Sequence, residues 1–152
     1  MKTIMLFLTG IFFSISFAQN LENKDIPQVV KDKFASSYTK TTHLKWTKEK
    51  SNYEASFRTG NKEMSVNFDE KGNIVETETE IKSSELPIEV RNSVSKDYSG
   101  YKITEAAKIE SNGIITFETE VTRGKDKKDL IYDGLGVLKS KGKKDQGGNN
   151  KD

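Results

Sequence analysis

Acidic side chains recur at every second position in two segments of this sequence. Glu76, Glu78 and Glu80 form one row, and Glu118 and Glu120 form another. Alternate residues of an extended strand point to the same side, so each row would gather its carboxylates on one face. Calcium is bound by several oxygen ligands, and such a row could supply some of them. The same alternation is typical of the solvated side of a half-buried sheet, which is the interpretation we favour, with a calcium or small-ligand site as the alternative.

Two Asp-x-x-Gly segments, Asp69–Gly72 and Asp133–Gly136, could be fragments of a calcium-binding loop. A complete loop needs further oxygen ligands at alternating positions, and Lys71 and Leu135 interrupt that pattern. Aspartate followed by glycine is also common in β-turns, because aspartate bonds nearby backbone N–H groups and glycine tolerates a positive φ. The two segments therefore predict tight turns.

Residues for nucleophilic or metal-assisted catalysis are scarce. His43 is the only histidine, and the sequence contains no cysteine. A Ser-His-Asp triad needs a histidine oriented by a carboxylate, and a zinc site needs several nitrogen or sulfur ligands. The spacing identifies no companion for His43, which we interpret as an exposed strand residue. We accordingly predict no catalytic residue, no cofactor and no enzymatic activity.

Aromatic side chains are the remaining candidates for contact with a partner, because they are enriched at the centres of protein interfaces. We select Trp46, Tyr53 and Tyr101 as candidate partner-binding residues. Trp46 and Tyr53 also fall at the spacing of core positions, so burial is the competing interpretation for both. Tyr101 lies in a predicted loop after Ser99-Gly100, where both interpretations stay open.

An internal repeat supplies the elements that would position these residues. The segment Tyr53–Ile74 returns as Phe117–Leu138 with a constant shift of 64 positions and no gap. Each copy predicts a strand, a turn, a returning strand, a second turn and a further strand. The matched pairs are Tyr53/Phe117, Phe57/Val121, Gly60/Gly124, Val66/Leu130, Phe68/Tyr132, Asp69/Asp133, Gly72/Gly136 and Ile74/Leu138.

An amphipathic helix is predicted before each copy. Asp25 is the expected N-cap of the first helix, and Pro27 lies in its first turn. Apolar residues then recur at intervals of four, which places them on one helix face. These rows are Ile26, Val30, Phe34 and Tyr38 in the first copy, and Leu86, Val90, Val94 and Tyr98 in the second.

The two helical rows are related by a shift of 60 rather than 64. We therefore expect four additional residues between the helix and the hairpin of the second copy, where a change in loop length costs little. A first strand is expected before each hairpin. Leu44 and Trp46 mark it in the first copy, and Ala107 and Ile109 are their expected counterparts in the second.

These patterns predict an α+β fold of two tandem repeats, each with one helix packed on a four-stranded antiparallel meander sheet. The expected divisions are 19–82 for the first repeat, 83–141 for the second, and a disordered polar tail at 142–152. One continuous sheet and two separate sheets are both compatible with the pattern.

The first eighteen residues have the features of a secretory signal peptide. Lys2 provides a positive start, Ile4–Phe17 is apolar, and Ser16 and Ala18 place small residues before a predicted cleavage site at Gln19. The apolar run is short for a membrane span of about 20 residues. We expect a periplasmic or secreted protein without stable membrane insertion after signal removal.

The distribution of charge argues against nucleic-acid binding. The net charge is +2, but residues 139–152 contain five lysines and only two aspartates. Residues 19–138 contain 19 basic against 21 acidic residues. A nucleic-acid interface requires lysine and arginine clustered on the folded body. We therefore expect no nucleic-acid partner.

Several motifs carry a resemblance to a known family. They are Leu86-Pro87 with Tyr98, Lys45-Trp46, Tyr53–Phe57 and Phe68-Asp69-x-x-Gly72. They resemble the PepSY-like family, also described as β-lactamase-inhibitor-like, of small exported proteins in Gram-negative bacteria. Tyr38-Thr39 and Tyr98-Ser99 depart from that family, which often has Tyr-Pro at these places. The resemblance implies a periplasmic location, tandem helix-plus-sheet units, protein binding or peptidase regulation, and no catalytic residue.

Our leading hypothesis is an exported, non-catalytic binding module, protein-binding or inhibitory and regulatory in the periplasm. It would engage another exported protein with its sheet surface. The alternative is a periplasmic small-ligand or calcium-binding protein that uses the acidic strand faces at Glu76, Glu78 and Glu80. An enzyme ranks third, because it would require a deep pocket with converging carboxylates.

Overall fold

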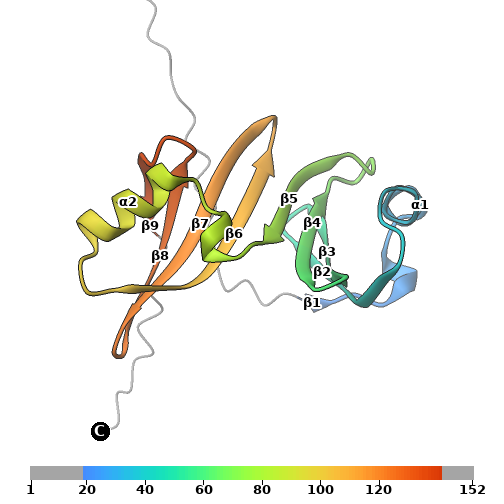
Figure 1. Cartoon of the computed structure of the whole chain (residues 1–152). Coiled ribbons are helices and arrows are strands. Elements are labelled where there is room, and N and C mark those ends of the chain that lie inside the picture. The colour runs from blue at the N-terminus through green and yellow to red at the C-terminus, as the bar shows by residue number, and fades with distance from the viewer. Residues whose placement is uncertain (1–18, 142–152) are drawn as a thin grey trace, which may run out of the picture.

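The computed structural model describes residues 19–141, and within this range it contains two α-helices and one nine-stranded antiparallel sheet (Figure 1). The strands lie side by side in the order in which they occur in the chain. The predicted α+β class is confirmed, and the strands of both repeats belong to one continuous sheet. The predicted signal peptide and the predicted disordered tail lie outside the described residues.

The first half of the chain forms one helix and five strands. They are β1 (Gln19–Asn20), the 3-10 turn η1 (Asn23–Asp25), α1 (Gln28–Ser37), β2 (Thr41–Glu49), β3 (Asn52–Thr59), β4 (Lys62–Phe68) and β5 (Ile74–Glu80). The second half consists of η2 (Ser83–Glu85), α2 (Ile88–Asp97), β6 (Lys102–Ser111), β7 (Ile114–Arg123), β8 (Asp126–Asp133) and β9 (Leu138–Lys141). The short strand β1 has no counterpart in the predicted pattern.

The predicted cap of the first helix is wrong by two residues. Asp25 closes the turn η1 instead, and its carboxylate accepts the Glu22 N–H at 3.2 Å. Pro27 then occupies the N-cap position of α1, where its missing N–H leaves no donor unsatisfied. Glu85 does the same in the second repeat, accepting the Lys82 N–H at 2.8 Å. In both repeats the acidic residue thus stabilises a local turn that precedes the helix.

Strand pairing follows the predicted shift of 64 in the three later strands of each repeat. Tyr53 lies opposite Phe68 in the first repeat, as Phe117 lies opposite Tyr132 in the second. The pairing of the next two strands is irregular just before Phe68, and it is irregular again just before Tyr132. The two halves therefore share one register and one local distortion.

The first strands follow a different shift, and the predicted counterparts in β6 are wrong. Trp46 lies opposite Ala55, and Ala106 lies opposite Thr119, the residue 64 positions after Ala55. Ala106 is therefore the counterpart of Trp46, and the shift of 60 continues from the helix through the first strand. The four additional residues lie in the β6–β7 hairpin, which they lengthen, and not between the helix and the hairpin.

The lengthened hairpin connects the two repeats. β5 pairs with β6 through five residue pairs, from Glu76 opposite Ser111 to Glu80 opposite Ala107. Two of these pairs use Glu110 and Ser111, which lie beyond the part of β6 that corresponds to β2. The additional residues thus extend the pairing that joins the two repeats in one sheet.

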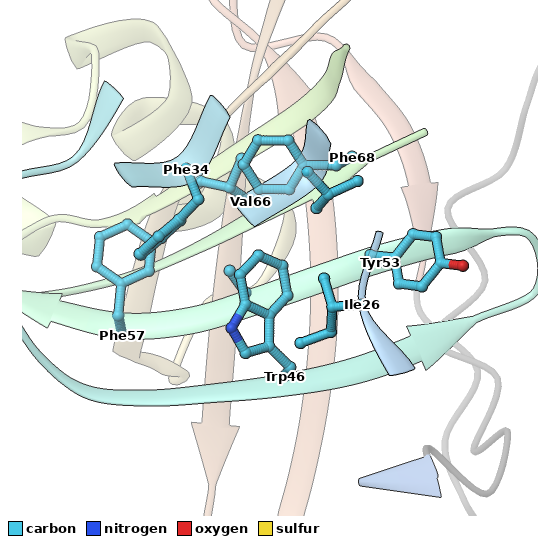
Figure 2. Close-up of a cluster of buried hydrophobic side chains, with 9 residues drawn as sticks. Ile26, Phe34, Trp46, Tyr53, Phe57, Val66 and Phe68 are labelled. Carbon is cyan, nitrogen blue, oxygen red and sulfur yellow. The ribbon is translucent and has the colours of Figure 1, made fainter. Parts of the chain in front are cut away.

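A cluster of aromatic side chains fills the first core, between α1 and strands β2 to β4 (Figure 2). Phe34 of the helix packs edge-on against Trp46 and Phe57, with ring centroids 5.4 Å and 5.1 Å apart. Such geometry adds favourable quadrupole interactions to the burial of apolar area. Phe57 and Phe68 are 3% and 0% exposed, as their alternation predicts.

The second core, under α2, is built from smaller side chains. Val94, Ala106 and Val121 take the positions of Phe34, Trp46 and Phe57. Tyr132 and Val121 are fully buried there, as predicted. Half-buried side chains, among them Tyr98, Tyr101, Ile103 and Phe117, complete this core from its margin.

The strand pairing shows that both helices pack on the same side of the sheet. Residues directly opposite one another in neighbouring strands point to the same side, and the strand residues of the two cores are related in this way. Figure 1 nevertheless shows α1 and α2 at opposite ends of the molecule. A twist of about 20–25° between neighbouring strands accumulates to roughly half a turn over such a sheet. One side of the twisted sheet is covered by the two helices, and the other side is not.

Candidate functional site

The side of the sheet away from the helices presents rows of directly opposed side chains. One row contains Thr47, Glu54, Asn67, Glu76, Ser111 and Ile114, and a second contains Lys45, Ser56, Ser65, Glu78, Ile109, Thr116 and Asp133. A third contains Glu80, Ala107, Glu118, Ile131 and Ser140, and a fourth contains Glu105, Glu120 and Asp129. We call these residues the open face. None of them belongs to either helix-packed core.

Two half-buried glutamates lie near the centre of the open face, on either side of β6. Burial, together with repulsion from the nearby carboxylates of Glu78 and Asp129, raises the pKa of the Glu118 carboxyl to about 7. Burial also raises the pKa of Glu78, with added repulsion from Glu76 and Glu54. No lysine or arginine among the described residues contributes to either shift. The centre therefore holds carboxyl groups whose charged forms are poorly stabilised.

Acidic groups nearer the margin are better compensated. Glu120 accepts hydrogen bonds from Thr104 Oγ1 at 2.7 Å and Lys127 Nζ at 2.9 Å, and these interactions lower its pKa. Glu54 accepts a hydrogen bond from Thr47 Oγ1 at 2.9 Å. Glu118 and Glu120, two residues apart on one strand face, thus have pKa values displaced in opposite directions.

Apolar side chains form the middle of this acidic surface. Ala107 and Ile109 of β6 and Ile131 of β8 are each at most 9% exposed, although no helix packs on them in the described part of the chain. Asn67 contributes a buried Oδ1 atom that has no hydrogen-bond partner among the described residues. The open face thus combines an apolar centre with acceptor oxygens around it.

The glutamate row predicted as an alternative calcium site, Glu76, Glu78 and Glu80, lies on the open face. Successive members of such a row are roughly 6–7 Å apart along the strand, whereas calcium needs its oxygens at about 2.3–2.6 Å. Among residues 19–141, no group of three or more His, Cys, Asp or Glu side chains is arranged to hold a metal ion.

Two of the predicted partner-binding residues, Trp46 and Tyr53, lie in the first core and are 9% and 7% exposed. The Tyr53 hydroxyl points to the margin of the core (Figure 2) and accepts a hydrogen bond from Lys48 Nζ at 3.0 Å. Their burial corresponds to the competing core interpretation, and little of either ring is accessible on the free protein.

Tyr101, the third predicted partner-binding residue, lies half-buried at the margin of the second core. Its hydroxyl donates a hydrogen bond to the Asp126 carboxylate, and the Arg123 guanidinium lies 4.5 Å from its ring centroid. The Tyr98 ring packs edge-on at 5.9 Å. Tyr101 is thus held by several contacts, and the structure does not bring it together with Trp46 and Tyr53 in one cluster.

The two Asp-x-x-Gly segments are turns, as predicted. Asp69 Oδ1 accepts the N–H groups of Lys71 and Asn73 at 2.9 Å and 2.8 Å, and Asp133 makes the equivalent bonds in the second repeat. Hydrogen bonds lower the pKa of both aspartates, first from the Asn73 side chain and backbone at Asp69 and from the Val137 N–H at Asp133. Gly72 and Gly136 have the expected positive φ, at 80° and 77°.

Neither His43 nor the described cavity forms a catalytic arrangement. His43 is exposed in an irregular part of β2 with a φ of 57°, and its Nδ1 lies 3.2 Å from Thr42 Oγ1. A cavity near the tip of the β6–β7 hairpin is lined mainly by apolar and small polar side chains, with Glu110 as its ionisable residue. It therefore lacks the converging carboxylates that an acid–base site would need.

Sequence reasoning missed three acidic contributors to the open face. Glu54, Glu105 and Asp129 add to the field at Glu78 or Glu118 but stand on other strands. Only the order of the strands places Glu54 in the same row as Glu76 of β5, with Asn67 of β4 between them. Strand order across the two repeats is a long-range property that local periodicity does not contain.

Comparisons with known proteins agree with this architecture. A family model described as "Putative beta-lactamase-inhibitor-like, PepSY-like" matches residues 15–75 and again residues 51–140. No curated protein sequence matches the chain. None of the helices among the described residues combines the length and apolar character needed to cross a bilayer.

Solved structures of Bacteroides proteins share the fold. A BLIP-like protein from Bacteroides fragilis is 25% identical, with a TM-score of 0.65 over 84% of this chain and 92% of its own. A DUF2874 family protein from Bacteroides uniformis is 20% identical, with a TM-score of 0.69 over 76% and 87%. A protein from Bacteroides eggerthii described as "putative periplasmic" is 16% identical, with a TM-score of 0.71 over 76% and 87%.

Proposed function

The chain belongs to the beta-lactamase-inhibitor-like, PepSY-like family, and on that premise we propose that it is an exported, non-catalytic binding module. It engages another exported protein through the open face and thereby inhibits or regulates that protein. One observation carries this proposal: both helices pack on one side of a continuous sheet, and the opposite side extends across both repeats. A broad rigid face of this kind suits a protein surface better than a small substrate.

The proposed location is the periplasm or the cell exterior. The predicted signal peptide at residues 1–18 supports export, and one structural relative is described as periplasmic. The family description, with its reference to an inhibitor, supports a protein partner over a catalytic role. The matching strand register of the two halves supports their origin as tandem repeats, with boundaries at 19–82 and 83–141.

A capture experiment with matched variants tests this function. Ser65 is half-buried on the open face, directly opposite Glu78, so Ser65→Trp adds bulk there without a change in charge. Glu89 is exposed on α2, so Glu89→Trp adds the same bulk on the helix-covered side. Immobilised mature protein would be exposed to periplasmic extract of the producing bacterium, and bound proteins would be identified by mass spectrometry.

We expect one protein to be retained by the wild type and by Glu89→Trp, and to be lost from Ser65→Trp. Binding of that purified protein to each variant, measured by calorimetry, would then give the affinities. Equal retention by the Ser65 variant, or loss from the Glu89 variant alone, would contradict the assignment of the open face.

A further inference from the structure

The charge of the open face indicates what kind of partner surface fits it. Its four rows contain one basic residue, Lys45, and nine acidic ones: Glu54, Glu76, Glu78, Glu80, Glu105, Glu118, Glu120, Asp129 and Asp133. Lys127, beside the fourth row, pairs with Glu120 at 2.9 Å, at the margin. The interactions that displace Glu78 and Glu118, at the centre, are all unfavourable to charge.

Repulsion of this kind lowers the folding stability of the unbound protein, and a bound cation relieves it. Removing carboxylates from water is costly unless a partner charge or hydrogen-bond donor replaces the solvent. Glu78 and Glu118 flank β6 from the two neighbouring strands, so a cationic group placed over β6 would lie near both. Complementary charge of this kind sets the specificity and the association rate of protein interfaces.

Two observations independent of the carboxylates point to a protein side chain as the source of that charge. Asn67 Oδ1, in the same row as Glu54 and Glu76, is a buried acceptor without a donor among the described residues. Ala107, Ile109 and Ile131 give the face an apolar centre. An arginine or lysine side chain matches both features, because its apolar stem can cover the apolar centre and its N–H groups can donate to the acceptor oxygen.

A metal ion fits these features less well. The described residues contain no group of three or more carboxylate or imidazole side chains arranged around one point, and an apolar centre offers a metal no ligand. On the helix-covered side, the strand residues between the two cores are Thr77, Thr79, Lys108 and Glu110, and Lys108 forms an ion pair with Glu110.

We propose that the open face binds a basic protein surface, one that places arginine or lysine side chains between Glu78 and Glu118 and apolar side chains over Ile109. This inference rests on the proposed function and adds the chemistry of the partner.

The test uses a defined probe, a blocked hexapeptide of alternating arginine and valine, with its glutamate–valine counterpart as the control peptide. Backbone amide shifts of the mature protein would be followed by NMR during titration. Glu78→Gln/Glu118→Gln removes two central charges, and Glu70→Gln/Glu89→Gln removes two exposed charges outside the open face. The first variant should fold, because neutralisation relieves repulsion rather than removing a favourable pair.

We expect the arginine peptide to shift the amides of Ala107, Ile109 and Ile131, and the glutamate peptide to leave them unchanged. The central double variant should bind the arginine peptide roughly three- to tenfold more weakly, as expected for the loss of two partly desolvated charge pairs. The outer double variant should bind like the wild type. Raising the salt concentration should weaken binding, because charge attraction is screened.

Equal affinity of the two double variants would overturn the inference, as would shifts confined to the helix-covered side. Calcium that displaces the peptide and shifts the same amides would assign the face to a metal ion instead. The proposed function fails separately: a captured partner that is lost from Ser65→Trp but binds Glu78→Gln/Glu118→Gln normally leaves the function intact and refutes only the basic partner.

Discussion

Replacing Glu118 by glutamine should stabilise the protein, and the gain should depend on pH. The carboxyl has a pKa of about 7 in the folded protein instead of its ordinary 4.5. A carboxyl with a raised pKa holds its proton more tightly in the folded than in the unfolded chain. Its contribution to stability is therefore complete below pH 4.5 and is lost as the pH rises through about 7. Above that value, folding keeps a charge in an unfavourable place.

The size of the effect follows from the displacement of the pKa. One pKa unit corresponds to about 1.4 kcal/mol, so the full displacement corresponds to roughly 3 kcal/mol. This is an upper bound, because Glu118 is only half-buried and solvent screens part of the repulsion from Glu78. Glutamine has the shape of the protonated acid and no charge at any pH. We expect Glu118→Gln to raise the free energy of unfolding by about 1–3 kcal/mol at pH 8 and by about zero near pH 4.

Urea unfolding measures this directly. Trp46 is the only tryptophan and is buried against Phe34 and Phe68, so its fluorescence reports the first core. Far-ultraviolet circular dichroism reports the whole sheet, and coincident transitions would establish two-state behaviour. Glu120→Gln is the matched control two residues away, where the charged form is favoured. That control should lose a few tenths of a kcal/mol at pH 8, as exposed pairs do.

The reasoning about Glu118 would be refuted by a stability gain of equal size at pH 4 and pH 8, which would indicate a change in packing or propensity rather than in charge. A loss of stability at pH 8 would refute it as well, because it would reveal a favourable interaction of the carboxylate. A gain at pH 8 in the Glu120 control would show that any reduction of negative charge stabilises the fold.

Three further predictions concern the cores and turns, each measured by urea unfolding. Tyr132→Phe removes a buried hydroxyl that has no partner among the described residues, so stability should stay equal or rise by about 1 kcal/mol, and a clear loss would reveal a bound donor or acceptor. Phe34→Ala should cost about 3–5 kcal/mol, well above Val94→Ala at the equivalent place, because Phe34 packs against four aromatic rings; equal losses would contradict the difference between the two cores. Gly136→Ala should be much more damaging than Gly60→Ala, because both have a positive φ but only at Gly136 would the new Cβ meet a backbone oxygen, at 2.5 Å; equal losses would show that φ alone decides.

Local patterns predicted those parts of the fold that local chemistry determines. Phe57 and Phe68 alternate with polar residues and are buried, because a strand has only two sides. Asp69 and Gly72 form the expected turn, because the aspartate bonds its own turn and the glycine accepts a positive φ. These features require no knowledge of the rest of the chain.

The register of β6 could not be read in the same way. Ala106, Ala107 and Ile109 are all apolar and all buried, so alternation does not say which side of the strand faces the helix. Ala106 faces α2, and Ile109 faces the other way. A shift by any odd number of residues exchanges the two sides, and the predicted counterpart of Trp46, Ile109, lies three residues after the actual one, Ala106.

The candidate site depends in part on the lengthened β6–β7 hairpin, which the sequence did not predict. If the β6–β7 hairpin were as short as β2–β3, β6 would end near Ile109, and the pairs that β5 forms with Glu110 and Ser111 would be absent. The pair of Glu78 with Ile109 would then be the last one between the two repeats, and Glu76 would have no strand residue opposite it on the side of the second repeat. The four additional residues therefore extend the strand pairing that holds Glu78 near Glu118. A single repeat could bury its own core, but it could not present the open face.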